Sequence, residues 1–155
     1  MIYRMSAALL SLAGLFISAY LYLYKIGKIG NLACGTGGCE TVQWSPWSQV
    51  VGVEVALVGV LGYAGLLGLS LAALQPGLVG RHWPATVLTV LAGIGVLFTA
   101  YLTYLEIFII HAICQWCVAS GIIVTGILVL GLLDRRRDRS APLSRSAAVP
   151  AGRSS

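Results

Sequence analysis

Four long apolar runs constrain this chain more than any other feature, because each has the length that crosses a lipid bilayer. They occupy approximately residues 5–24, 52–74, 85–110 and 113–133 of the 155 residues, and a spanning helix needs about 20 apolar residues. Only 10% of the residues are charged, against about 25% in an average soluble domain. The sequence therefore predicts an all-α integral membrane protein in which residues 1–133 form a four-transmembrane-helix bundle.

The segments between these runs are polar or rich in turn-forming residues. Residues 40–51, ETVQWSPWSQVV, predict a short amphipathic helix on the membrane surface. Residues 75–84 predict a turn-rich connector, and residues 134–155, rich in Arg, Ser, Pro and Ala, predict a disordered tail. The first run is too long for the apolar core of a cleaved signal peptide and ends in tyrosines, so we expect it to remain as a span.

Positive charges set the expected orientation. Four spans put both termini on one side, which holds eight arginines: Arg4, Arg81, Arg135, Arg136, Arg137, Arg139, Arg145 and Arg153. The opposite side holds only Lys25 and Lys28. Because cytoplasmic segments carry the excess of Lys and Arg, we expect cytoplasmic termini. The basic residues are not interleaved with aromatic ones, which argues against nucleic-acid binding.

The four cysteines form two close pairs, and the expected orientation places both pairs on the outward, oxidising face. Cys114 and Cys117 form a C-x-x-C at the start of a helix, where unpaired N–H groups favour a thiolate. Cys34 and Cys39 flank three glycines, which allow the loop to flex. Two such pairs predict a relay by thiol–disulfide exchange. Inert structural disulfides remain an alternative, as does a four-thiolate zinc site, which the oxidising face disfavours.

A relay at the mouth of a membrane bundle needs an electron acceptor that lives in lipid, and a quinone meets that need. Quinone reduction takes up protons, and two acidic residues, Glu54 and Glu106, lie inside apolar runs. Burying a charge in lipid is costly, so these carboxylates are expected to face the bundle or the interface. A proton relay is one interpretation of both, and simple contact with water at the outer ends is the other.

Two stretches, ACGTGGCETVQWSPWSQVVGVEVALVGVLGY and YLTYLEIFIIHAICQWCVAS, resemble the vitamin K epoxide reductase family, in particular its bacterial members. The resemblance covers about residues 20–120, and the order of loop pair and then C-x-x-C is specific. It implies a four-helix bundle in a bacterial inner membrane, around a quinone of the menaquinone, ubiquinone or vitamin K type. Many bacterial members carry a fused thioredoxin-like domain. This chain does not, so the resemblance implies a separate extracytoplasmic thioredoxin-fold partner.

The matched motifs also imply roles for single residues. Cys34 is implied to face the partner, Cys39 to shuttle to Cys114, and Cys117 to face the quinone. The candidates for the quinone pocket are Ser45, Trp44, Trp47, Tyr101, Tyr104 and Glu106. Many relatives have a proline where this chain has Glu54, which leaves the start of the second span and the role of Glu54 open.

These interpretations predict an oxidoreductase, specifically a quinone-dependent thiol oxidase. It would pass electrons from the thioredoxin-fold carrier through both cysteine pairs to a membrane quinone, and so drive disulfide formation in exported proteins. One alternative is a quinone or vitamin K epoxide reductase as the main role. The other is a non-enzymatic multispan protein whose disulfides are structural.

Overall fold

The four apolar runs are helices in the computed structural model, which describes residues 2–35, 37–50, 52–75 and 82–147, with the side chains of residues 82 and 138–147 excepted. The long helices are α1 (Ile2–Lys25), α3 (Val55–Ala72), α4 (His82–Leu105), which the π-helical turn η2 (Glu106–Ile110) extends, and α5 (Gln115–Ala147). Each is long and apolar enough to cross a membrane. The predicted all-α, four-helix membrane bundle is confirmed.

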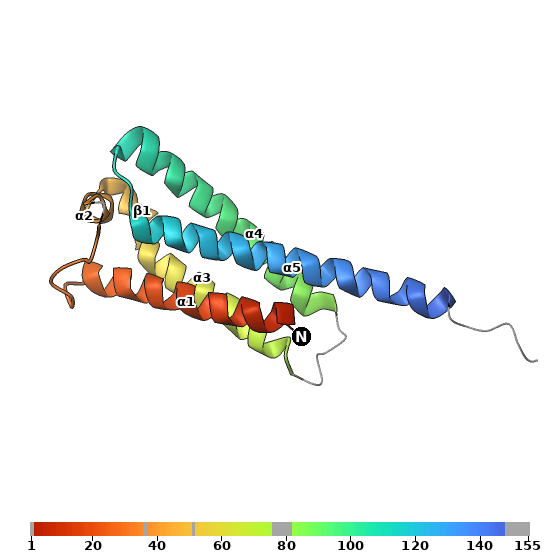
Figure 1. Cartoon of the computed structure of the whole chain (residues 1–155). Coiled ribbons are helices and arrows are strands. Elements are labelled where there is room, and N and C mark those ends of the chain that lie inside the picture. The colour runs from red at the N-terminus through yellow and green to blue at the C-terminus, as the bar shows by residue number, and fades with distance from the viewer. Residues whose placement is uncertain (1, 36, 51, 76–81, 148–155) are drawn as a thin grey trace, which may run out of the picture.

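The helices run side by side, and the cysteine-bearing segments gather at the end opposite the N-terminus (Figure 1). Helix α1 packs against α3 and α5, and α4 packs against α5. Contacts between α3 and α4 are sparser, and α4 leans away from the other helices toward the end that carries α2 (Figure 1). Residues of α3 and α4 near the cysteine end line a cavity, described below.

A small cap covers that end. It consists of α2 (Cys39–Gln43), the 3₁₀ turn η1 (Pro46–Ser48) and the antiparallel strands β1 (Gln49–Val50) and β2 (Val53–Glu54). The helix predicted in residues 40–51 is therefore present only as α2. Pro46 holds Ser45 in an extended conformation, with φ −68° and ψ 152°, because a residue before proline is excluded from the helical region.

A partly buried ion pair joins the helices at the far end of the bundle. Arg4 donates from Nε to Asp134 Oδ2 at 2.9 Å and from Nη1 to the carbonyl of Ala73 at 3.0 Å, so that α1, α5 and the end of α3 meet there. The tail predicted to be disordered from residue 134 differs from the structure, since α5 continues to Ala147; arginine is a good helix former. Residues 148–155 and most of the predicted connector, residues 76–81, lie outside the described residues.

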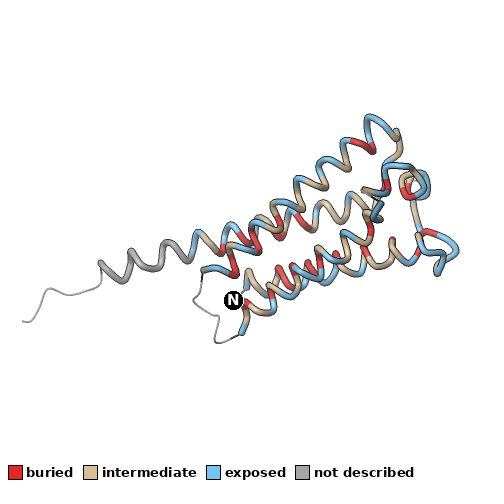
Figure 2. Tube along the Cα trace, turned by 180° about the vertical axis from the view of Figure 1, so that it is seen from behind, coloured by how far each residue is buried: buried red, intermediate tan, exposed pale blue. Residues whose placement is uncertain are grey.

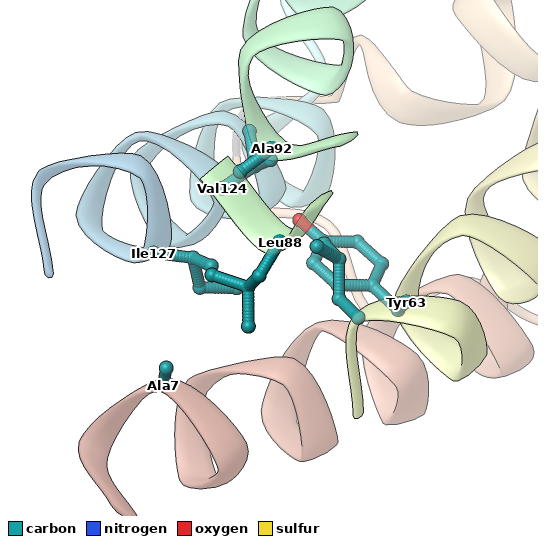
Figure 3. Close-up of a cluster of buried hydrophobic side chains, with 7 residues drawn as sticks. Ala7, Tyr63, Leu88, Ala92, Val124 and Ile127 are labelled. Atoms are coloured by element: carbon teal, nitrogen blue, oxygen red, sulfur yellow. The ribbon is translucent and has the colours of Figure 1, made fainter. Parts of the chain in front are cut away.

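The residues coloured as buried lie mainly on the inward-facing stretches of the helices (Figure 2). The central cluster joins all four long helices (Figure 3), and its members are Ala7, Tyr63, Leu66, Leu88, Ala92, Val124 and Ile127. Tyr63 is the one member with a polar group, and its hydroxyl donates to the carbonyl of Ser120 at 2.7 Å. Burying a phenol among apolar side chains is favourable only because this bond satisfies it.

Small residues let α1 and α3 approach closely. A Cβ on Gly14 would lie 2.5 Å from Cζ of Tyr63, and a Cβ on Gly59 would lie 2.8 Å from Oγ of Ser18. Without a hydrophobic drive between helices in lipid, such close backbone packing supplies much of the association.

Replacing Gly14 by valine is therefore expected to lower the free energy of unfolding by about 1–3 kcal/mol, the usual cost of overpacking. The Tyr63 ring would have to leave its place and lose its bond to Ser120. Thermal unfolding of the detergent-solubilised protein measures the change. Gly68→Val is the matched control, because no atom of the described residues lies within 4 Å of a Cβ built there. Equal losses in both variants would contradict the close packing.

Candidate active site

All four cysteines belong to one cluster of packed side chains at the capped end. Cys34 and Cys39, the loop pair, form a disulfide, whereas Cys114 and Cys117, the inner pair, are free thiols. Cys39 and Cys114 are both 0% exposed, while Cys34 and Cys117 are only partly buried against the same cluster. One member of each pair is thus enclosed with one member of the other.

A glycine allows the two cysteine segments to meet. A Cβ on Gly38 would lie 2.6 Å from the carbonyl oxygen of Ile113 and 3.0 Å from its nitrogen. The main chain directly before Cys39 therefore rests against the main chain directly before Cys114, and any larger residue at position 38 would push them apart.

The loop before the disulfide is held through its main chain. The N–H of Ala33 donates to Tyr20 Oη at 3.0 Å, and Nε1 of Trp116 donates to the carbonyl of Ala33 at 2.8 Å. The N–H of Gly35 donates to Oε1 of Gln115 at 3.0 Å. Tyr20 and Trp116 also meet edge to face, with ring centroids 5.5 Å apart. Cys34 thus lies between residues fixed to α1 and to the C-x-x-C.

Cys114 occupies the residue before the first turn of α5, and its carbonyl accepts the first helical bond from the N–H of Val118 at 3.1 Å. A hydrogen bond from the Cys117 thiol lowers the pKa of Cys114. Burial opposes this effect, and the backbone N–H groups of Cys117 and Trp116 reinforce it. The thiolate is the nucleophile in thiol–disulfide exchange. Of the inner pair, Cys114 is therefore the member suited to exchange with the loop pair.

Glu106 links the end of the third span to the inner pair. Its Oε2 accepts the N–H of Cys114 at 3.1 Å, and the Cys117 thiol is within hydrogen-bonding reach of its carboxyl group. The π turn that begins at Glu106 closes with a bond from the N–H of Ala112 to its carbonyl at 3.1 Å, and such turns are frequent at functional sites. Glu106 is 3% exposed, so contact with bulk water does not explain it.

A cavity of about 340 Å³ lies under the cap, between α3 and α4. Its size falls in the range of small-molecule sites, about 300–1,000 Å³. Most of its walls are apolar, and the polar groups are few: Ser18, Gln43, Ser45, Ser48, Tyr63, Thr99, Thr103, Glu106, Cys117 and Ser120. Cys117 lines this cavity and Cys114 is not among the described residues that do so. The inner pair therefore has one sulfur toward the loop and the other toward the cavity.

The model of the vitamin K epoxide reductase family matches residues 5–132. The chain belongs to the vitamin K epoxide reductase family. Members of this family are oxidoreductases whose chemistry is linked to quinones, so the chain is a multi-pass membrane oxidoreductase. An apolar cavity with a thiol and a carboxyl group in its wall fits the planar, largely apolar head of a quinone.

Three of the six residues predicted for the quinone pocket line this family member's cavity, namely Ser45, Trp47 and Glu106. Their contact with a quinone stays a prediction. Trp44, Tyr101 and Tyr104 are not among the described residues that line the cavity, and they are 65%, 49% and 55% exposed.

Seven polar residues of the cavity wall were not predicted from the sequence: Ser18, Gln43, Ser48, Tyr63, Thr99, Thr103 and Ser120. Two of them carried a signal. Tyr63 is a lone phenol in the middle of an apolar run, and a buried phenol requires a partner. Ser120 follows Cys117 by one helical turn and therefore shares its face of α5.

Lys25, at the end of α1, holds the cap in place. Its Nζ donates to the carbonyl of Gln43 and to Oγ of Ser48 at 3.0 Å, and it lies 4.7 Å from the centre of the Trp44 ring. The carboxylate of Glu54 completes this set at 3.7 Å from Nζ. Glu54 thus pairs with Lys25 at the start of α3 and is not among the described residues that line the cavity.

Lys25→Met is expected to loosen the cap, because it removes a charged donor that joins α2, η1 and β2. Amide hydrogen exchange in α2 and η1 should become about 10- to 100-fold faster, the equivalent of losing a charged hydrogen bond. Lys28→Met is the matched control, since Lys28 is exposed. Unchanged exchange in the Lys25 variant would show that the cap is held by its apolar contacts alone.

Proposed function

We propose that this protein is a thiol oxidase that passes electrons from a separate thioredoxin-fold carrier, through the loop pair and then the inner pair, to a membrane quinone. The product outside the membrane is an oxidised carrier, which forms disulfides in exported proteins. The proposal places the protein in a bacterial inner membrane with cytoplasmic termini. The excess of arginine at the end of the bundle opposite the cysteines supports this orientation.

The graded burial of the four sulfurs is the observation that carries the proposal. Cys34 is partly exposed in a loop outside the bundle, Cys39 and Cys114 are fully buried in one cluster, and Cys117 lines the cavity. A structural disulfide would need no such order. The free inner thiols next to a disulfide-bonded loop also provide the reactants of exchange.

Each step moves two electrons. Two thiols of the carrier reduce the Cys34–Cys39 disulfide, and the carrier leaves as a disulfide. The two loop thiols then reduce a disulfide of the inner pair, through a bond between Cys39 and Cys114, and the loop disulfide forms again. The inner pair finally gives two electrons and two protons to the quinone, which accepts both when bound, and closes as a disulfide. Glu106 is placed to receive the proton of Cys117 and to release it into the cavity.

Thiol trapping in cells tests the proposal. With quinone present, the loop pair should be largely oxidised, and quinone depletion should leave all four cysteines reduced, as read by mass tagging with a maleimide. After mild reduction, a membrane-impermeant maleimide should label Cys34 in intact cells. Cysteines that stay oxidised under both conditions would mean structural disulfides, and labelling only after lysis would reverse the orientation. Purified protein that consumes vitamin K epoxide with dithiothreitol, but no quinone, would favour the epoxide reductase.

A further inference from the structure

Both residues inside the C-x-x-C contact the main chain of the loop next to Cys34, and Gln115 does so on both sides of it. The side-chain amide of Gln115 does so with its two halves. Its Oε1 accepts the N–H of Gly35 at 3.0 Å, and its Nε2 lies 3.5 Å from the carbonyl of Ala33. A carboxamide offers an acceptor and donors side by side. Gln115 therefore pairs with the N–H and C=O groups of the loop in the way that the main chain of a neighbouring β-strand would.

We propose that Gln115 is a positioning residue for electron transfer between the two cysteine pairs, a proposal that rests on the relay described above. By binding the main chain before and after Cys34, its carboxamide sets the register of the loop on the C-x-x-C. That register is what puts Cys39 against Cys114.

The two contacts of the Gln115 carboxamide with the main chain, at Ala33 and Gly35, are called here the clasp. The loop needs this clasp because its own sequence gives it little rigidity. It contains three glycines between the cysteines, and glycine loses the most conformational freedom on being fixed. Exchange requires two sulfurs to meet in line, and prior fixation of the reacting groups raises the rate of such a step. Bonds to the main chain fix the loop whichever partner Cys39 holds, so the clasp can act in each redox state.

Substitution of Gln115 is expected to disturb neither the quinone step nor the fold. It is not among the described residues that line the cavity, and its side chain is only half-buried. Trp116 binds the same Ala33 carbonyl but also packs on Tyr20, so changing Trp116 would disturb α1 as well. Gln115 is therefore the cleaner residue to change.

The first measurement follows exchange alone. In a Cys117→Ser background the inner pair cannot close, so the Cys114 thiolate attacks Cys39, a Cys39–Cys114 bond forms, and Cys34 leaves as a thiolate that takes up a proton. The detergent-solubilised protein is held at about pH 4, where few thiolates exist, and then brought to about pH 7.5. Acid quenching and mass spectrometry give the rate. Gln115→Leu should slow it by about 10- to 100-fold, the loss of two hydrogen bonds.

Gln115→Glu sharpens the test because it keeps the acceptor for Gly35 and replaces the donor with an oxygen that faces the Ala33 carbonyl. It should slow exchange at least as much as Gln115→Leu does, and Gln75→Leu, an exposed glutamine at the other end of the bundle, should not. Equal rates in all variants would overturn the proposal.

The second measurement separates positioning from a structural role. In chains with Cys117 intact, reduction of ubiquinone-1 by reduced thioredoxin, which enters through the loop, should fall by the same factor in Gln115→Leu. With both loop cysteines changed to serine, reduction driven by dithiothreitol, which reaches the inner pair directly, should be unaffected by Gln115→Leu. A fall in this direct rate would overturn positioning. If Gln115→Leu slows exchange in the first measurement as expected, but no chain reduces quinone, the proposed function would be refuted. The positioning role of Gln115 would still be supported.

Discussion

Cys117→Ser is expected to abolish quinone reduction and to accumulate a chain with a disulfide between Cys39 and Cys114. Cys117 is the sulfur that lines the cavity, so its loss removes the group that delivers electrons there in the proposed relay. Without Cys117, no thiol can attack Cys114 to release Cys39, so only Cys34 can reverse the bond by re-forming the loop disulfide, and both bonded sulfurs are fully buried. Digestion without reduction, followed by mass spectrometry, should show the Cys39–Cys114 peptide as the dominant cross-link.

The reciprocal variant provides the control. Cys34→Ser should stop reduction driven by reduced thioredoxin, because the partly exposed member of the loop pair is gone, while dithiothreitol should still drive part of the quinone reduction through the inner pair. A dominant Cys34–Cys114 peptide in the Cys117→Ser protein would exchange the roles of the two loop cysteines. Finding neither cross-link would refute the relay.

Glu106→Gln is expected to lower quinone reduction by about 10²- to 10⁴-fold, the usual contribution of a positioned acid or base. Glutamine can still accept the N–H of Cys114, so the start of α5 should keep its geometry, but it cannot receive the proton of Cys117. Steady-state reduction of ubiquinone-1 with dithiothreitol measures the loss, and the fold is checked by thermal unfolding.

The loop-to-helix step should be spared in the same variant. Formation of the Cys39–Cys114 bond in a Cys117→Ser background needs no proton from Glu106, so its rate should change little when Glu106→Gln is added. Glu40→Gln, a change to an exposed carboxylate in α2, is the matched control for charge. Normal quinone reduction in the Glu106 variant would mean that this carboxyl group only holds the main chain of Cys114.

The sequence alone predicts the bundle because lipid leaves a spanning chain few choices: main-chain groups must be paired internally, and a run of about 20 apolar residues does so as a helix. The same reasoning brings Cys34, Cys39, Cys114 and Cys117 to one end, which the structure bears out. Glu106 was also found by this route, since a carboxylate in an apolar run must face something other than lipid.

Most of the cavity wall could not be predicted, because both faces of a membrane helix are apolar. An apolar side chain such as leucine is equally favourable against lipid and in the protein interior. The pattern of apolar residues therefore does not show which face of α3, the one with Tyr63 or the opposite one, points into the bundle. Aromatic residues near a helix end are equally satisfied at the interface, and Tyr101 and Tyr104 are exposed on the surface of α4. The pairing of Lys25 with Glu54 depends on the turn at Pro46, which brings Ser48 and Gln43 to the same ammonium group.

The loop is gripped by its main chain at Ala33 and Gly35, and by the fit of Gly38 against Ile113. Contacts of this kind do not read side chains. In the proposed relay, electron transfer from the loop to the inner pair therefore depends little on most of the loop's side chains, whereas the proposed carrier would meet those side chains directly. The loop sequence could then change to suit a different carrier, with Gly38 retained, while the route from Cys39 to the cavity stays the same. Evolution or protein engineering could thus alter recognition of the carrier without altering that route.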